Sequence, residues 1–101
     1  MSTPEGKVKA AIKKLLDEHN IYYFMPATGG YGRSGVPDFI GCARGRFFSI
    51  EAKAGKAKPT ALQLREMERI KAGGGLAYVI NEDTVADLYY LTLPGHIRLL
   101  R

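Results

Sequence analysis

The side chains best suited to chemistry lie in two short segments, Pro37-Asp38-Phe39-Ile40 and Ile50-Glu51-Ala52-Lys53. Each segment lies in or beside an apolar run that predicts a β-strand. Two carboxylates, with a lysine two residues after the second one, are the groups that metal-assisted cleavage of a phosphodiester requires. The carboxylates hold a divalent cation, and the lysine lies beside the attacking water or the phosphate.

The spacing of Glu51 and Lys53 puts both side chains on one face of a strand, because successive side chains point to opposite faces. Ala52 then points to the other face, with Ile50 and Phe48, and can be buried against a helix. The competing interpretation is a solvated ion pair on an exposed strand, which is the usual reading of an isolated E-x-K sequence. The preceding Pro-Asp, its glycine-rich approach and the strand context favour the chemical site.

Asp38 reaches the same region if residues 37–42 and 46–53 pair as neighbouring strands. Their short connection, Ala43-Arg44-Gly45-Arg46, carries a glycine, as a tight hairpin does. Asp38 could also be a strand-edge aspartate without a ligand. A carboxylate sheltered from water without a partner is costly, however, so a sheltered pair of carboxylates argues for a cation.

The composition indicates one small domain that spans residues 1–101. Hydrophobic residues make up 46% of the chain, which is enough for a core without disulfides. The single cysteine, Cys42, lies in an apolar strand and is expected to be a small core residue. Two histidines and one cysteine are too few for a zinc site. The net charge of +5 favours a polyanionic partner, and the lysines cluster on the first helix and after the second carboxylate.

Hydrophobic periodicity and turn residues predict one mixed α/β sheet with helices on its faces, in the order α-β-β-β-α-β-α. The glycine-rich segment 26–36 is a loop without the Gly-Lys-Ser/Thr of a P-loop. Residues 76–80 form an apolar run of the kind buried on both faces, and a strand–helix–strand crossover places it parallel to 46–53. The expected elements are helices 3–19, 60–72 and 82–91, strands 21–25, 37–42, 46–53 and 76–80, and a final short strand or tail at 96–101.

With these elements in place, the chain resembles the PD-(D/E)XK nuclease superfamily, and within it the stand-alone virus-type replication-repair nuclease (VRR-NUC) domain. The residues that carry the resemblance are Gly35-Val36-Pro37-Asp38, Phe48-Ser49-Ile50-Glu51-Ala52-Lys53 and Gln63 on the following helix. The resemblance extends over nearly the whole chain. It implies a restriction-endonuclease-like core and cleavage of DNA that depends on Mg²⁺ or Mn²⁺.

The resemblance also implies roles for individual residues. Asp38, Glu51 and the backbone carbonyl of Ala52 would bind the metal, and Lys53 would position or deprotonate the water. Glu5 matches an acidic residue of the first helix that reaches toward the metal, and Gln63 matches a helix glutamine near the scissile phosphate. Stand-alone members resemble Holliday-junction resolvases and act as homodimers, so branched DNA and a second copy of the chain are the expected partners.

Glu5 and Gln63 each have a structural alternative. Ser2-Thr3-Pro4-Glu5 and Thr60-Ala61-Leu62-Gln63 both fit a capping box, in which the fourth residue closes the first helical turn. Further contacts to DNA phosphates are expected from basic and polar residues outside the two segments, with solvated side chains as the alternative: Lys13, Arg33, Ser34, Lys56 and Lys58.

Two readings of function remain open at this point. The first is a metal-dependent, structure-selective DNA endonuclease of replication, recombination or repair. The second is a basic nucleic-acid-binding module without catalysis, and an RNA-directed nuclease is a more distant alternative. No signal peptide or membrane-spanning run is visible, so the expected compartment is the cytoplasm, and the resemblance suggests a bacterial or phage source.

Overall fold

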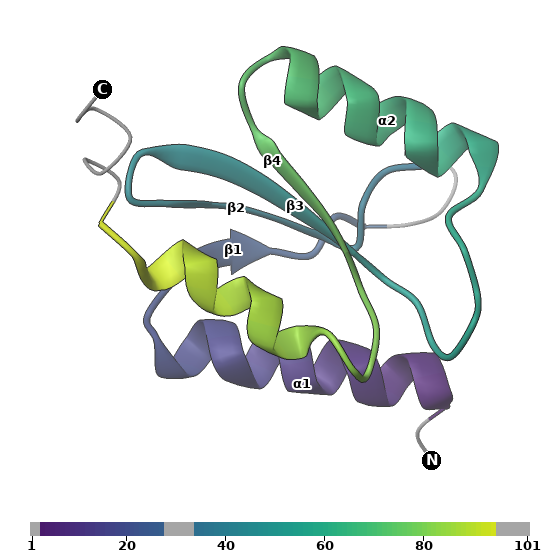
Figure 1. Cartoon of the computed structure of the whole chain (residues 1–101), viewed down its shortest axis with the longest axis horizontal. Helices are drawn as coiled ribbons and strands as arrows, with labels where there is room; N and C mark the ends of the chain where they lie inside the picture. The colour runs from purple at the N-terminus through teal and green to yellow at the C-terminus, as the bar shows by residue number, and fades with distance from the viewer. Residues whose placement is uncertain (1–2, 28–33, 95–101) are drawn as a thin grey trace.

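The computed structural model describes residues 3–27 and 34–94, which form a four-stranded sheet with helical segments on both faces (Figure 1). The strands lie in the order β1-β2-β3-β4 across the sheet. Along the chain the elements are α1 (Pro4–Glu18), β1 (Tyr22–Phe24), β2 (Phe39–Ala43), β3 (Arg46–Ala52), α2 (Ala61–Ala72), β4 (Leu76–Ile80) and the 3-10 helix η1 (Val85–Thr92).

The sheet is mixed. β2 runs antiparallel to both β1 and β3, and β4 runs parallel to β3 with α2 as the crossover between them. β2 and β3 are joined by a two-residue turn, since Ala43 pairs with Arg46. Both turn residues, Arg44 and Gly45, have a positive φ, which suits the twist of a tight hairpin. The predicted hairpin and the predicted parallel crossover are therefore confirmed.

The core lies between one face of the sheet and the layer formed by α1 and η1. From α1 it takes the stripe of Val8, Ile12, Leu15 and Leu16, which recurs at helical spacing. From β3 it takes Phe48, Ile50 and Ala52, all fully buried. The expected alternation along β3 is thus confirmed, and the opposite face, toward α2, is the one left for Glu51 and Lys53.

Three expectations about the elements are wrong. Cys42 is exposed. It lies on the same sheet face as Tyr22 and Phe47, and α2 covers that face mainly over β3 and β4. β4 is an edge strand, so only Ile80 is buried and Val79 remains 38% exposed. The segment predicted as helix 82–91 forms a 3-10 helix that starts later. The predicted strand or tail at 96–101 lies outside the described residues.

No helix in residues 3–27 or 34–94 is long and apolar enough to cross a membrane.

Candidate functional site

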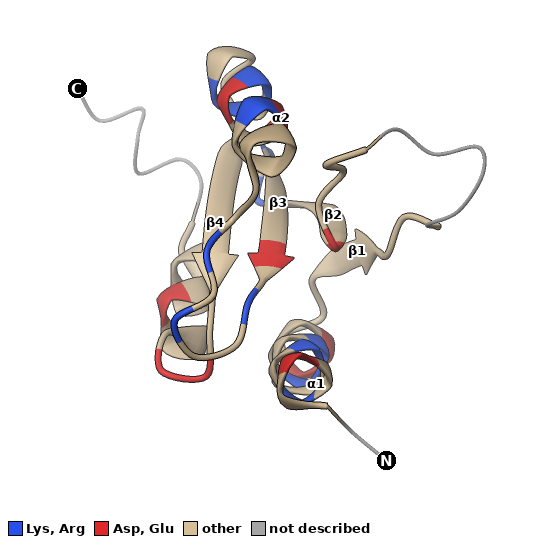
Figure 2. Cartoon of the chain, turned by 90° about the vertical axis from the view of Figure 1, so that its right-hand side faces the viewer, with Lys and Arg blue, Asp and Glu red and all other residues tan. Residues whose placement is uncertain are grey.

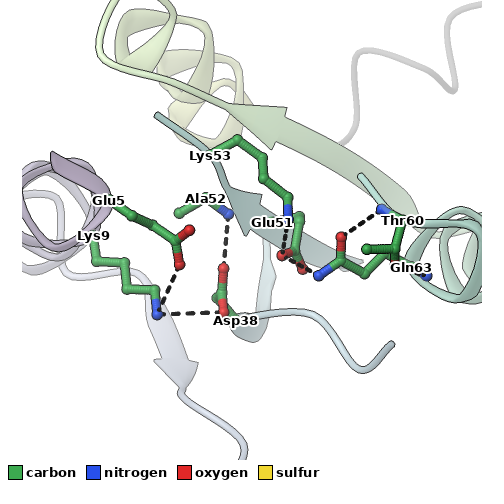
Figure 3. A network of polar contacts seen from close by, with 8 residues as sticks. All are labelled: Glu5, Lys9, Asp38, Glu51, Ala52, Lys53, Thr60 and Gln63. Atoms are coloured by element: carbon green, nitrogen blue, oxygen red, sulfur yellow. Dashed lines mark hydrogen bonds and ion pairs between the residues drawn. The ribbon is translucent and has the colours of Figure 1, made fainter. Parts of the chain in front are cut away.

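The end of β3 carries the first half of the site. Glu51 is 4% exposed and lies on the sheet face toward α2. Its Oε2 accepts a hydrogen bond of 2.8 Å from Nε2 of Gln63 and lies 3.6 Å from Nζ of Lys53 (Figure 3). The E-x-K spacing therefore does what strand geometry predicts, and both side chains meet on one face.

Asp38 lies one residue before β2 and contacts the end of β3 through its side chain. Its Oδ2 accepts a hydrogen bond of 2.9 Å from the backbone N–H of Ala52 (Figure 3). The N–H and C=O of one residue in a strand point to the same side, so the Ala52 carbonyl is on the side of Asp38. Two neighbouring strands thus bring together Asp38, Glu51 and the main chain of Ala52.

The approach to Asp38 is held against the first turn of α2. Gly35 has a φ of +84°, and a Cβ added there would lie 2.6 Å from the carbonyl carbon and oxygen of Leu62. Only glycine permits both the left-handed backbone and this close approach. The glycine of the Gly35-Val36-Pro37-Asp38 segment therefore allows this segment to pack closely against α2. This packing fixes the position of Asp38 relative to α2.

Gln63 forms the capping box that the sequence suggested and also contacts a carboxylate of the site. Its Oε1 accepts a hydrogen bond of 2.8 Å from the backbone N–H of Thr60, whose Oγ1 in turn accepts from the N–H of Gln63 at 3.2 Å. This is the predicted capping box. The same amide uses its Nε2 to donate to Glu51, so the helix cap also orients a carboxylate of the site.

Glu5 does not take part in the predicted capping box. The N-cap of α1 is Thr3, whose Oγ1 accepts from the N–H of Gly6 at 3.0 Å, so Glu5 is one position too early to close a box. The Glu5 carboxylate is directed instead at Lys9, with 3.4 Å between Oε2 and Nζ. α1 thus presents an acidic side chain toward the site, although Glu5 touches neither Glu51 nor Asp38 in the contacts of Figure 3.

Lys9 is the site residue that sequence reasoning missed. Its Nζ lies 3.6 Å from Oδ1 of Asp38 as well as 3.4 Å from Glu5 (Figure 3). Burial alone would lower the pKa of Lys9, but the negative charges of Asp38 and Glu5 outweigh burial and raise it. The available signal was the i,i+4 spacing of Glu5 and Lys9, which places both on one side of a helix.

The pKa of the Glu51 carboxyl is raised from 4.5 to about 7. Burial is the largest cause and the nearby negative charge of Asp38 is the next, while Lys53 acts in the opposite direction. Oε1 of Glu51 is buried and has no hydrogen-bond partner among the described residues. A carboxylate in this setting is stabilised by a cation, because a buried charge without a partner is costly.

The donor set fits a hard divalent cation, which prefers carboxylate and carbonyl oxygens. Asp38, Glu51 and the Ala52 carbonyl supply such oxygens, and the unpartnered Oε1 of Glu51 supplies a reason to bind one. In the described part of the chain, no three His, Cys, Asp or Glu side chains group closely enough to hold a metal by themselves. Any such site here would depend on the main chain in addition to two carboxylates.

The described residues that are expected to contact DNA lie on the connection between β3 and α2, on α1 and just before Gly35. Lys56 and Lys58 are exposed on the connection between β3 and α2, which Figure 2 shows as a run of basic positions. Lys13 is exposed on α1, and Ser34 is exposed just before Gly35. Arg33 lies outside the described residues. Figure 2 also shows acidic residues on α1, at the start of β2 and near the end of β3.

The chain is similar to a solved structure described as a VRR_NUC domain. The TM-score is 0.71 and the sequence identity is 28%, and the match covers 88% of this chain and 97% of the other one. Neither a family model nor a curated protein matches the sequence.

The mixed sheet, its helices and the α-β-β-β-α-β order define a fold of the restriction-endonuclease-like class. Within that class, the structural match supports a VRR-NUC domain, that is, a nuclease-family domain.

Proposed function

We propose that the chain is a metal-dependent deoxyribonuclease that hydrolyses phosphodiester bonds at branched DNA. The observation that carries this proposal is the buried Glu51 carboxylate with one unpartnered oxygen, placed beside Asp38, Lys53 and Gln63. An ion pair between Glu51 and Lys53 with a purely structural role would not need the Asp38 carboxylate beside it. Nor would it need the Ala52 main chain next to Asp38, or a glutamine from α2 that contacts Glu51.

The residues of the site have separate tasks in this proposal. Asp38, Glu51 and the Ala52 carbonyl would hold Mg²⁺ or Mn²⁺, which when bound acidifies a water and neutralises charge on the phosphate. Lys53 lies beside Glu51, where it would orient the attacking water and stabilise the developing negative charge. Gln63 fixes the direction of the Glu51 carboxylate from the first turn of α2.

DNA is the proposed substrate because the chain is basic and carries exposed lysines on the β3–α2 connection and on α1. Lys56, Lys58 and Lys13 are exposed, and the chain carries a net charge of +5. Lysine contacts to phosphates bind a backbone without reading its sequence, which suits selection by DNA shape. We further propose that two copies act together on a four-way junction, one site for each strand.

Replacement of the site residues tests the catalytic part of the proposal. Asp38→Asn, Glu51→Gln and Lys53→Met should each lower cleavage by on the order of 100-fold or more, because each removes a charge that the transition state needs. The measurement is cleavage of end-labelled duplex, flap and four-way-junction DNA with Mg²⁺, Mn²⁺ or EDTA. Circular dichroism and DNA binding should remain close to the wild-type values.

Glu68→Gln is the matched control. It makes the same chemical change on an exposed side chain of α2, which pairs with Lys71 at 3.6 Å. This variant should cleave like the wild type. Full activity of Glu51→Gln would refute the proposed site. Salt-sensitive DNA binding without cleavage by the wild type under any condition would favour the non-catalytic binding module.

A further inference from the structure

Lys9 places a positive charge between two carboxylates that come from different elements. Its Nζ lies 3.4 Å from Oε2 of Glu5 on α1 and 3.6 Å from Oδ1 of Asp38 before β2 (Figure 3). A positive charge between two carboxylates reduces their mutual repulsion, which a bound divalent cation would also do. In this chain a side chain of the first helix supplies that charge.

The contacts divide the site into two halves that share Asp38. On the α1 side, Oδ1 of Asp38 and the Glu5 carboxylate are matched to the Lys9 ammonium. On the β3 side, Oδ2 of Asp38 accepts from the Ala52 N–H, and Oε1 of Glu51 has no partner among the described residues. The half that contains Glu51 therefore has an unsatisfied acceptor, whereas the half that contains Glu5 already has its cation.

The charges of the site agree with a single metal ion. The carboxylates of Glu5, Asp38 and Glu51 carry three negative charges when ionised, and the ammonium groups of Lys9 and Lys53 carry two positive ones. One divalent cation changes the resulting single negative charge into a single positive one, which a DNA phosphate neutralises. A second divalent cation would leave an excess of positive charge and would have to displace Lys9.

We propose that Lys9 takes the position of a second divalent cation, so that this nuclease works with one metal ion bound by Asp38 and Glu51. The inference rests on the proposed function. It makes Lys9 a positioning residue, which holds Asp38 and Glu5 in place without touching the water or the scissile phosphate.

The test is the number of Mn²⁺ ions bound at neutral pH, measured by the electron paramagnetic resonance signal of free Mn²⁺ and by calorimetry. The wild type should bind one ion. Lys9→Met should bind two, because the Glu5 and Asp38 carboxylates then lack a cation. Lys9→Arg keeps the positive charge and should bind one ion. The double variant Glu5→Gln/Lys9→Met removes the added site and should also return to one ion.

Lys7→Met is the matched control, since Lys7 is exposed on the same helix, and it should bind one ion. Two ions in the wild type, or one ion in a folded Lys9→Met, would overturn the role of Lys9 and leave the nuclease proposal intact. No ion in the wild type would overturn the metal-dependent function itself, and the Lys9 inference with it. Lys9→Gln replaces Lys9→Met if circular dichroism shows that the methionine variant does not fold.

Discussion

Glu51 combines near-complete burial with two close charges of opposite sign, Asp38 and Lys53. Its pKa is raised from 4.5 to about 7, first by burial and then by Asp38. Between these two values the folded state holds a proton that the unfolded chain has released. Without metal, the free energy of unfolding therefore falls as the pH rises through this window, and it stays lower above it.

Glu51→Gln should remove this pH-dependent decrease in the free energy of unfolding. In EDTA at about pH 8, we expect the variant to be more stable than the wild type by on the order of 3 kcal/mol, since each pKa unit corresponds to about 1.4 kcal/mol. At about pH 4 the two proteins should be nearly equally stable, because both side chains are then neutral. Urea unfolding at the two pH values measures the difference.

The exposed Glu68→Gln change should show no comparable difference between the two pH values, because an exposed carboxylate gains little from neutralisation. An equal effect of Glu51→Gln at both pH values would mean that Glu51 ionises in the folded protein without a penalty.

Asp38, Glu51 and Lys53 could be predicted as one cluster because strand alternation and a short hairpin suffice to bring them together. Lys9 could not be predicted as a partner of Asp38. Its distance to Asp38 depends on how α1 crosses the sheet, and that packing has no local sequence signal. Glu5 was ambiguous for a related reason, because Ser2 and Thr3 could both cap a helix and the fold selects Thr3.

At the scale of elements, the loop before β2 and the first turn of α2 support each other through Gly35. A Cβ at this position would meet the Leu62 backbone at 2.6 Å. The backbone cannot move away without shifting Asp38 or the Thr60–Gln63 cap. The chain therefore couples the position of one carboxylate to that of the glutamine that holds the other.

Gly35→Ala should lower the free energy of unfolding by about 3 kcal/mol or more, because it adds a backbone clash to the cost of a left-handed alanine. It should also reduce cleavage, since Asp38 and Gln63 are displaced. Denaturant unfolding and the cleavage assay measure the two effects.

Gly74→Ala is the control, with a φ of +92° and nothing within 4 Å of the added Cβ. It shares the conformational cost and lacks the clash, so we expect a loss of about 1 kcal/mol and normal cleavage. Equal losses for the two variants would show that packing against α2 is unimportant.

The helices and strands themselves were predictable, because periodicity and caps mark them locally. α1, α2 and β4 begin and end within one residue of the expected positions. The burial of individual faces was not predictable in the same way. Cys42 was expected in the core and is exposed to solvent, since the sequence does not reveal which part of a sheet face a helix covers. Val79 was misjudged because nothing local marks β4 as an edge strand.

At the scale of the whole molecule, α2 covers only part of its face of the sheet, and the uncovered part carries exposed aromatic side chains. Tyr22, Cys42 and Phe47 form a row across β1, β2 and β3, and Phe24 lies in the next row. Tyr22 is 65% exposed and Phe47 is 46% exposed. Apolar side chains gathered on one surface favour a protein interface, which supports the proposed homodimer.

Tyr22→Ser/Phe47→Ser should therefore convert a dimer into a monomer, because it removes the two large aromatic side chains of that row. Sedimentation velocity at micromolar concentrations measures the change. Tyr90→Ser is the control, because Tyr90 is 51% exposed on η1, which covers the other face of the sheet. It should leave the dimer intact. A wild type that sediments as a monomer would exclude the paired arrangement on a junction.

The backbone N–H of Ala52 donates to a side chain, that of Asp38, and not to the backbone of a neighbouring strand. β2 begins only at Phe39, so the Asp38 carboxylate accepts from Ala52 where the hydrogen-bond ladder of β2 and β3 would otherwise continue. The Ala52 amide can exchange its hydrogen for deuterium from solvent only when that carboxylate releases it. The exchange rate of this single amide therefore measures how often Asp38 separates from the end of β3, and it can be measured without metal or DNA.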